Sequence, residues 1–535
     1  MAEPLEGADR HRSAPAGGGP WSTAWELLLP AATAPARQRG RALQSALREA
    51  VRAGRLAAGT RLPSSRDLAA DLGVSRGLVT EAYEQLTAEG YLRSDRGSGT
   101  WVGEAARGGV RSAHAPTPRS VAAQVNFRPG TPDLSLFPRS AWAATHKSVL
   151  ARLPHRSLGY PDPRGLPALR EQLAALLTRR RGVVADPGRL VVCSGVTQAT
   201  ALLGSVLHAH GLRSIGVEDP GSPSHGPVFT SVGLRMAALP LDAEGLAMGP
   251  LRASGVRAVM TTPAHQFPTG IAYSARRRIE LLDWARAVDG LIFEDDYDGD
   301  FRYDRAPVGA LQGLDPDRVA YSGSVSKSLA PGLRLGWVVV PPRLLEEVVE
   351  RKRTMDLGNP ALDQEVLADF VDRGGYDRQL RRCQRAYRER RDALVRALDE
   401  HLPGTRVSGI AAGLHIIARL PARYGPEEAF RKRAADAGVA VRLLSDHRMT
   451  GDDVQTTDGT GMAAARLPTE PADGTVSAAS VAGMSDAAGG AGGVAVLDTA
   501  SGSGDGGVDL VLGYAHLSPA EIARGVGLLA RAGTP

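Results

Sequence analysis

The sequence predicts a large α/β domain with a mostly parallel sheet and a smaller C-terminal α+β subdomain, joined to an N-terminal domain of three helices and a two-stranded wing. Three observations support this prediction. The 535 residues exceed what a single hydrophobic core normally organises. Before residue 103, three helical patterns are followed by two short strand patterns. From Asn126 onward, apolar β-rich runs alternate with helical segments: LVVCS, RAVMTT, GLIFED, VAYSGS and GWVVV.

The first two helices are predicted by an apolar stripe and by a capping motif. The stripe follows Arg41, ends before Gly54 and has three members: Leu43, Leu47 and Val51. In LPSSRD, the Ser64 side chain can accept a hydrogen bond from the backbone at a helix start, and Asp67 three residues later completes a capping box. A second helix is therefore expected to begin at this motif.

The third helix is predicted to begin at Ser75 and to end at Gly90. One face of it carries the spacing of a packed helix: Val79, Ala82, Tyr83 and Leu86. The following run, YLRSDRGSGTWV, reads as two short strands around a Gly-rich turn, which completes the wing.

Composition changes along the chain set the predicted domain boundaries. Residues 1–24 are rich in Ala, Gly, Pro and Arg without a period, which predicts a disordered tail. Residues 25–103 form the winged domain, residues 104–125 form a linker, and residues 126–535 form the large domain. Within the large domain, the Gly-, Ala- and Ser-rich stretch at about 451–507 predicts a disordered surface insertion.

Composition also excludes several classes of protein. Cys193 and Cys383 are the two cysteines of the chain, and their positions match neither a disulfide framework nor a metal site. The first residues lack an export signal, and no apolar run approaches the roughly 18 residues that span a bilayer. We expect a cytoplasmic protein with no membrane partner and no metal.

Basic residues concentrate near the N-terminus. Residues 37–103 contain eleven Arg, no Lys and seven acidic residues. A recognition helix needs polar and basic side chains at its N-terminus, where Ser75 and Arg76 stand. Arg66 begins the second helix, and Arg96 with Gly97 forms a wing tip that can approach a duplex closely. Although a single exposed Arg is as often only solvated, the joint pattern predicts a winged helix-turn-helix that binds double-stranded DNA.

The run GRLAAGTRLPSSRDLAADLGVSRGLVTEAYEQLTAEGYLRSDRGSGTWV resembles the GntR family of winged-helix regulators almost throughout. The resemblance implies that five residues of this run contact DNA: Arg66, Ser75, Arg76, Arg96 and Gly97. Gly77 departs from the family pattern, because many members have a hydroxyl or a longer polar side chain there. One DNA contact is therefore expected to be missing.

A lysine lies in a Ser- and Gly-rich turn after a predicted strand. SGSVSKSLAPGLRLGW places Lys327 after Ser324 and Ser326 and before Arg334, among glycines that allow the backbone to wrap an anion. Taken alone, a lysine in such a turn is more often a surface cation.

Two further motifs lie at the ends of predicted strands. FEDDYD follows the GLIF strand, at the edge where open α/β sheets bind ligands, and supplies Asp295 and Tyr297. SGVTQAT places the backbone N–H groups of Val196 and Thr197 at a helix N-terminus, which favours a phosphate. With Lys327, these groups match what pyridoxal 5'-phosphate (PLP) requires: an amine for its aldehyde, a carboxylate for its ring nitrogen, a donor for its phenolic oxygen and a phosphate cup.

The large domain resembles fold type I aminotransferases, and the whole chain resembles the MocR/GabR/PdxR-like subfamily of GntR regulators. The runs that carry this resemblance are TPAHQFPTG, EDDYDGDFRY, SKSLAPGLRLGW and AGLH. It implies PLP on Lys327 and a homodimer, in which Tyr160 of LGYPDPRGLPALR reaches the phosphate of the other subunit.

Two positions of the large domain depart from the family pattern. Ser222 stands where an aromatic ring usually stacks on the pyridine ring of PLP. Val511 stands near the position of the arginine that clamps a substrate carboxylate in aminotransferases. The first departure bears on cofactor affinity, and the second prevents any transfer of substrate binding from the family.

Three functions are open at this point. The first is a PLP-dependent transcription regulator that senses an effector, either PLP itself or an amino compound such as GABA or taurine, without efficient turnover. The second is an aminotransferase with an accessory DNA-binding domain, against which the missing clamp argues. The third is a repressor whose large domain only dimerises, against which Lys327, Asp295, Tyr297 and Arg334 argue. The first is favoured, so no residue is assigned a catalytic role.

Overall fold

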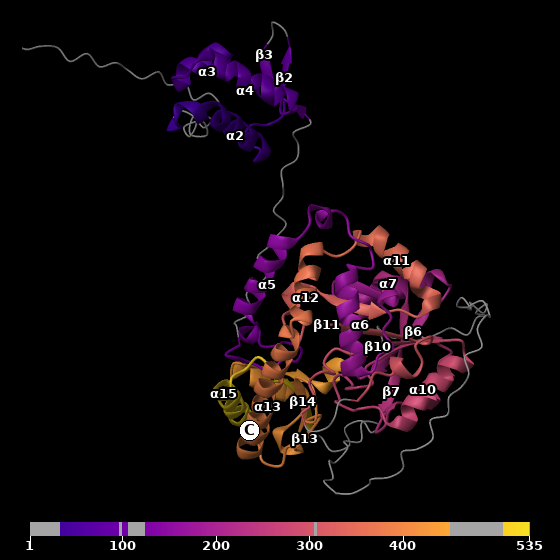
Figure 1. Ribbon diagram of the computed structural model, residues 1–535. Helices are drawn as coiled ribbons and strands as arrows, with labels where there is room; N and C mark the ends of the chain where they lie inside the picture. Colours follow the sequence, from indigo (N-terminus) through magenta and orange to yellow (C-terminus); the bar gives the residue numbers. More distant parts are fainter. Residues whose placement is uncertain (1–32, 96–98, 105–122, 304–307, 450–506, 534–535) are drawn as a thin grey trace, which may run out of the picture. The chain divides into compact units, whose positions relative to one another are not determined.

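The computed structural model describes residues 33–95, 99–104, 123–303, 308–449 and 507–533 (Figure 1). The chain forms two compact units, Met1–Ser120 and Val121–Pro535, each with its own hydrophobic core. The predicted tail, most of the predicted linker and most of the predicted insertion lie outside the described residues, as do Arg96 and Gly97.

The first unit has the predicted three helices and wing. Its helical segments are η1 (Ala36–Gln38), α2 (Arg39–Arg52), α3 (Ser65–Leu72) and α4 (Arg76–Ala88). Its strands are β1 (Arg61–Leu62), β2 (Leu92–Asp95) and β3 (Gly99–Val102), which pair antiparallel in the order β1-β3-β2. The predicted apolar stripes are all buried: Leu43, Leu47, Val51, Val79, Ala82, Tyr83 and Leu86. The strand β1 was not predicted, because two residues carry no alternating pattern.

Side-chain caps fix the starts of α3 and α4. Ser64 Oγ accepts a hydrogen bond from the Asp67 N–H at 3.2 Å and donates one to the Asp67 carboxylate at 2.6 Å. Ser75 Oγ accepts from the Leu78 N–H at 3.4 Å. Between the helices, Gly73 has a φ of +62°, a conformation that glycine adopts without strain. Both predicted helix starts are therefore confirmed, and they set the turn of the helix-turn-helix.

Gly77 occupies the second position of α4, and a Cβ atom added there would meet no other heavy atom within 4 Å. We expect Gly77→Ala to raise the local stability of α4 by about 0.5 to 1 kcal/mol, because alanine loses less conformational entropy in a helix than glycine does. Native-state hydrogen exchange of the α4 amides measures this effect. The matched control Gly73→Ala should lower stability instead, and slower exchange in neither variant would contradict this description of α4.

An eight-stranded sheet forms the centre of the large unit. Its order is β5-β12-β11-β10-β9-β6-β7-β8, and all pairings are parallel except those made by β12 and β8. The strands are β5 (Leu190–Cys193), β6 (Ser214–Asp219), β7 (Arg235–Asp242), β8 (Gly245–Leu246), β9 (Ala258–Thr261), β10 (Leu291–Asp295), β11 (Val319–Ser324) and β12 (Gly336–Val339). The predicted mostly parallel sheet is therefore confirmed.

Helices cover both faces of this sheet (Figure 1). Alternate residues of β5 enter different cores: Leu190 and Val192 pack with α6, whereas Val191 and Cys193 pack with α7 and α11. The helices of this part are α6 (Pro167–Arg181), α7 (Val196–Ala209), α8 (His225–Ser231), α9 (Met248–Ala253), α10 (Ala275–Ala287) and α11 (Pro342–Asp356). Strands buried on both faces explain why the strand runs are apolar throughout.

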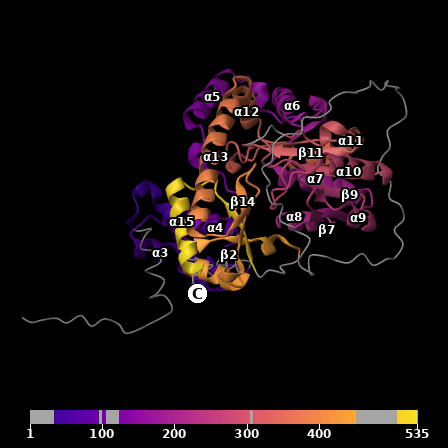
Figure 2. The ribbon, with the colours of Figure 1, turned by 90° about the horizontal axis from the view of Figure 1, so that it is seen from below.

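The predicted α+β subdomain is also present. Its antiparallel sheet has the order β13-β14-β17-β16, with strands β13 (Arg406–Ser408), β14 (His415–Leu420), β16 (Arg442–Leu443) and β17 (Val508–Gly513). The helices α13 (Gly375–His401) and α15 (Pro519–Gly533) lie side by side in both ribbon views (Figure 2), and α14 (Glu427–Asp436) completes this part. The neighbouring strands β16 and β17 are separated in sequence by residues 450–506, outside the described residues. Further elements are β4 (Val125–Asn126), paired with β15 (Val439–Ala440), and the helices α5 (Arg139–Arg152) and α12 (Ala361–Asp372).

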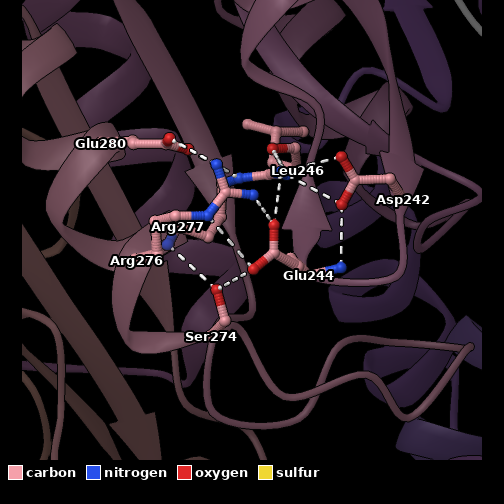
Figure 3. A network of polar contacts seen from close by, with 7 residues as sticks. All are labelled: Asp242, Glu244, Leu246, Ser274, Arg276, Arg277 and Glu280. Atoms are coloured by element: carbon pink, nitrogen blue, oxygen red, sulfur yellow. Dashed lines mark hydrogen bonds and ion pairs between the residues drawn. The ribbon is translucent and has the colours of Figure 1, made fainter.

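A polar network holds the β7–β8 hairpin against the start of α10 (Figure 3). The buried Arg277 donates to both carboxylate oxygens of Asp242, at 3.0 and 2.8 Å, and to the Leu246 carbonyl. Ser274 caps α10 and donates to Glu244 at 3.1 Å. These charge-assisted bonds fix the β7–β8 edge of the sheet to α10. None of the helices in the described ranges is long and apolar enough to cross a membrane.

Candidate cofactor site and DNA-binding surface

A cavity of about 1370 Å³ lies at the carboxyl ends of the parallel strands, where β10 ends at Asp295 and β11 ends at Ser324. Eight of the residues predicted to hold PLP line it: Val196, Thr197, Asp295, Tyr297, Ser324, Ser326, Lys327 and Arg334. Segments that are far apart in sequence therefore converge on one space, as expected for an open α/β sheet.

Lys327 follows β11 and reaches across the cavity. Its Nζ donates a hydrogen bond to the Gly130 carbonyl at 2.5 Å. Burial lowers the pKa of this amine, and the carboxylates of Asp298 and Asp295 oppose that effect. A lowered pKa increases the fraction of unprotonated amine, which is the form that attacks an aldehyde.

Asp295 and Tyr297 flank Asp296 in the FEDDYD motif, and both line the same cavity. Burial, and then the nearby Asp296, raise the pKa of Asp295 to about 7. A cation beside this carboxylate, such as a protonated ring nitrogen, favours its charged form. The Tyr297 hydroxyl lies 3.0 Å from His265 Nδ1. Burial raises the pKa of Tyr297 well above its ordinary value. Tyr297 therefore keeps its proton and can donate a hydrogen bond.

The pKa of Asp295 predicts an unusual pH dependence of stability in protein prepared without PLP. Because the folded protein holds this proton up to about pH 7 and the unfolded chain releases it near 3.8, the free energy of unfolding should fall as the pH rises between these values. We expect Asp295→Asn to remove this loss and to stabilise the PLP-free protein at pH 8 by on the order of 2 kcal/mol. Chemical denaturation at pH 5 and pH 8 measures it. An equal pH dependence in the wild type and the variant would contradict the assignment.

An anion cup lies at the N-terminus of α7. Gly195 has a φ of +89°, and a Cβ atom there would lie 3.2 Å from the Arg334 guanidinium. The Arg334 side chain donates to the Ser194 carbonyl. The N–H groups of Val196 and Thr197 begin the helix, so they have no acceptor within it. A glycine turn, two helix-terminal donors and a guanidinium are the groups that a phosphate requires, so this side of the cavity fits the phosphate of PLP.

Tyr160 and the two departures from the family pattern lie in different surroundings. The Tyr160 side chain is 88% exposed and is not among the residues that line the cavity. Ser222 lines the cavity, and its hydroxyl lies 2.8 Å from that of Ser224. Val511 is fully buried and packs against Ile417 and Leu444. Ser222 therefore presents a small hydroxyl to the cavity in place of an aromatic ring, and Val511 presents no cation to it.

Several lining residues carried no motif signal that could have identified them from the sequence: His225, Arg442, His447 and Arg448. Burial lowers the pKa of His225 to about 4 and also lowers the pKa of His447. Both imidazoles are therefore neutral near pH 7. Arg442 lies on β16 and Arg448 lies in the segment after it. Only the folding of the chain brings this part of the sequence to the cavity.

The predicted DNA-binding residues that the structure describes lie on the surface of the first unit. Arg66, Ser75 and Arg76 are exposed, and Arg76 Nε lies 3.5 Å from Ser65 Oγ. Arg66 and Arg76 stand in the first turns of α3 and α4 respectively. The two helix N-termini therefore present guanidinium groups to solvent.

The wing strands carry a second basic feature that was not predicted. The guanidinium groups of Arg61 and Arg93 each lie 5.8 Å from the centroid of the Trp101 ring. Such stacking orients the charged groups along the sheet. The pairing of β1 with β3 brings Arg61 to this position, and β1 had no sequence signal.

Comparison with known proteins identifies both units. The model of "Aminotransferase class I and II" matches residues 123–452, and the model of "Bacterial regulatory proteins, gntR family" matches residues 40–102. The probable rhizopine catabolism regulatory protein MocR of Rhizobium meliloti is 35% identical, over 76% of this chain and 86% of its own length. The HTH-type pyridoxine biosynthesis transcriptional regulator PdxR of Corynebacterium glutamicum is 34% identical, over 76% and 88%.

Among solved structures, an archaeal alanine:glyoxylate aminotransferase superposes with a TM-score of 0.59 at 26% identity, covering 77% of this chain and 90% of its own. This similarity accounts for the fold of the large unit, while the GntR match covers the first unit and the PdxR relative is named an HTH-type regulator. The chain therefore belongs to the MocR/PdxR type of GntR-family transcription regulators, in which a helix-turn-helix DNA-binding unit is joined to an aminotransferase class I and II domain.

Proposed function

We propose that this regulator binds double-stranded DNA through its first unit and senses a small molecule through PLP held on Lys327 in its second unit. The observation that supports this most is the convergence of eight predicted PLP ligands on one cavity. The effector would be PLP itself or an amino compound such as GABA or taurine, and the relative named for pyridoxine biosynthesis supports the first of these. The protein would act in the cytoplasm.

Each group around the cavity has a role in this proposal. The Lys327 amine would attach the cofactor through its aldehyde, Asp295 would hold the ring nitrogen, and Tyr297 would donate to the phenolic oxygen. The phosphate would be held by the α7 N-terminus and three side chains: Ser324, Ser326 and Arg334. When bound, PLP supplies an electrophilic carbon that condenses reversibly with primary amines.

The proposed DNA contacts are Arg66, Ser75 and Arg76, together with Arg96 and Gly97 of the wing tip. The exposure of all three described residues supports the first three, and two of them, Arg66 and Arg76, carry guanidinium groups at the starts of α3 and α4. Charged side chains at helix N-termini can contact phosphates and base edges together, so they set both affinity and register.

A homodimer would complete the site. The high exposure of Tyr160 is unusual for an aromatic side chain, and Leu158 two residues earlier is 63% exposed. Contact with a second subunit would cover both side chains, and Tyr160 would then reach the partner's phosphate cup. Sedimentation of the wild type and of Leu158→Asp should show a dimer and a weakened dimer respectively, and a monomeric wild type would contradict the proposal.

The competing function is an aminotransferase with an accessory DNA-binding unit, which the retained Lys327 and the similarity to aminotransferases favour. Transamination also requires a substrate held in one orientation over the ring. Ser222 and the buried Val511 supply neither a stacked ring nor a carboxylate clamp. We therefore propose that ligands exchange on the cofactor without efficient turnover.

Absorption spectroscopy with added PLP, combined with a gel shift on the DNA upstream of its own gene, tests the proposed function. We expect a protein-bound cofactor band that differs from the band of free PLP, because the lysine amine condenses with the aldehyde, and a DNA complex that responds to PLP or to an amine. Multiple turnovers of an amino acid and keto acid pair would favour the aminotransferase instead.

A further inference from the structure

The position of the missing carboxylate clamp lies in a small apolar cluster. Val511 of β17 is fully buried against Ile417 of β14 and Leu444. In the sheet, Val511 lies directly opposite Ile417 on one side and Arg442 of β16 on the other. Residues directly opposite each other in antiparallel strands place their side chains on the same face. A cation thus stands one strand away from Val511, on the same face.

Arg442 is available to a ligand. Its side chain lines the cavity that contains Lys327 and is 45% exposed. The nearest carboxylate oxygen, on Asp446, is 3.8 Å from the guanidinium. Asp446 itself is engaged by Arg431 at 2.7 Å and by the Leu443 N–H at 3.0 Å. Since Asp446 is already satisfied, the donors of Arg442 can turn to an anion in the cavity.

The net charge of the cavity lining also favours the binding of an anion. Six basic side chains line it: Arg128, Arg235, Lys327, Arg334, Arg442 and Arg448. Two acidic side chains line it, Glu218 and Asp295, and burial raises the pKa of both. Glu218 already accepts hydrogen bonds from Thr262 at 2.6 Å and Tyr273 at 2.5 Å. The cationic excess suits a second anionic group in addition to one phosphate.

The size of the cavity allows a second molecule. Its volume of about 1370 Å³ exceeds the roughly 300 to 1,000 Å³ of pockets that enclose one drug-sized ligand. Arg442, His447 and Arg448 line it from β16 and the segment that follows, whereas the phosphate cup is built by α7 and Arg334. The two basic groups therefore come from different elements and need not serve the same anion.

We propose that Arg442 recognises a carboxylate of the effector, which makes the effector an amino carboxylate whose amine is directed to Lys327 and its cofactor. This inference rests on the proposed function. Val511 supplies no charge at the position of the clamp, and Arg442 supplies a cation from the neighbouring strand instead. A planar guanidinium binds a carboxylate through two parallel hydrogen bonds, which gives the ligand a fixed orientation.

Equilibrium titration of the PLP-loaded protein tests this inference, with the cofactor spectrum as the readout. The probes are L-alanine, β-alanine, 4-aminobutyrate and 5-aminovalerate, each compared with the alkylamine that remains when hydrogen replaces its carboxylate. We expect the wild type to bind at least one amino carboxylate about tenfold more tightly than its alkylamine. Arg442→Gln should weaken that amino carboxylate roughly 10- to 100-fold and leave the alkylamine unchanged, because one charge-assisted pair is lost. The affinity of Arg442→Lys for that amino carboxylate should fall between those of the wild type and Arg442→Gln.

The matched control is Arg406→Gln, an exposed arginine on β13 of the same sheet that does not line the cavity, and it should behave as the wild type. A wild type that prefers no amino carboxylate, or an Arg442→Gln variant that keeps the preference, would overturn the inference. A wild type that acquires no cofactor absorbance would contradict the proposed function instead, so the two failures are distinguishable.

Discussion

Lys327→Ala should abolish the absorbance band that PLP acquires on the protein, together with every response of the protein to amines. The amine of Lys327, whose pKa burial lowers, is the one lysine amine among the residues described as lining the cavity. Its removal leaves the phosphate cup without the covalent attachment. DNA affinity in the absence of ligand should be retained, because the helix-turn-helix belongs to a separate compact unit. PLP titration by absorption, beside a gel shift, measures both effects.

The matched control for this prediction is Lys147→Ala, which removes an exposed lysine of α5 outside the cavity. It should leave the spectrum unchanged. A wild-type spectrum in Lys327→Ala would show that PLP, if bound, is attached elsewhere, and a loss of unliganded DNA affinity would show that the variant acts through folding.

Arg76→Ala should weaken DNA binding by about 1 to 3 kcal/mol, or roughly 5- to 150-fold. Arg76 is the first residue of α4, it is exposed, and its distance of 3.5 Å from Ser65 Oγ leaves its other donors free for DNA. An arginine that reads a base should lose sequence preference on removal, whereas one that contacts a phosphate should make the salt dependence shallower. Fluorescence anisotropy over a range of salt concentrations separates the two.

The control is Arg41→Ala, which removes an exposed arginine of α2 outside the helix-turn-helix. Its affinity should match the wild type. Equal affinities of Arg76→Ala, Arg96→Ala and the double variant with the wild type would refute the assignment of the recognition surface.

Local features of this protein could be predicted from sequence because their physical causes are local. Ser64 and Ser75 cap helices with bonds that span three residues, and the apolar stripes match the helical period. The cavity residues Asp295 and Lys327 could be predicted because Asp295 ends one strand of the parallel sheet and Lys327 lies three residues after the end of another, at the edge where ligand sites form.

Features that depend on pairing between distant segments could not be predicted. The two-residue strand β1 has no pattern of its own and exists because β3 pairs with it. Arg442 shares a sheet face with Val511 although residues 450–506 separate their strands in sequence. The absence of an arginine at Val511 could be recognised from the sequence, whereas the cation opposite it could be recognised only from the register of β16 and β17.

We propose that ligand chemistry at Lys327 in one unit alters DNA binding by the other. The most direct test measures the affinity of the full chain for a duplex from its own upstream region by fluorescence anisotropy, with and without PLP and with PLP plus each amino carboxylate. The affinity of the wild type should change with ligand, whereas the affinity of Lys327→Ala should stay constant. Identical affinities of the wild type under all conditions would contradict it.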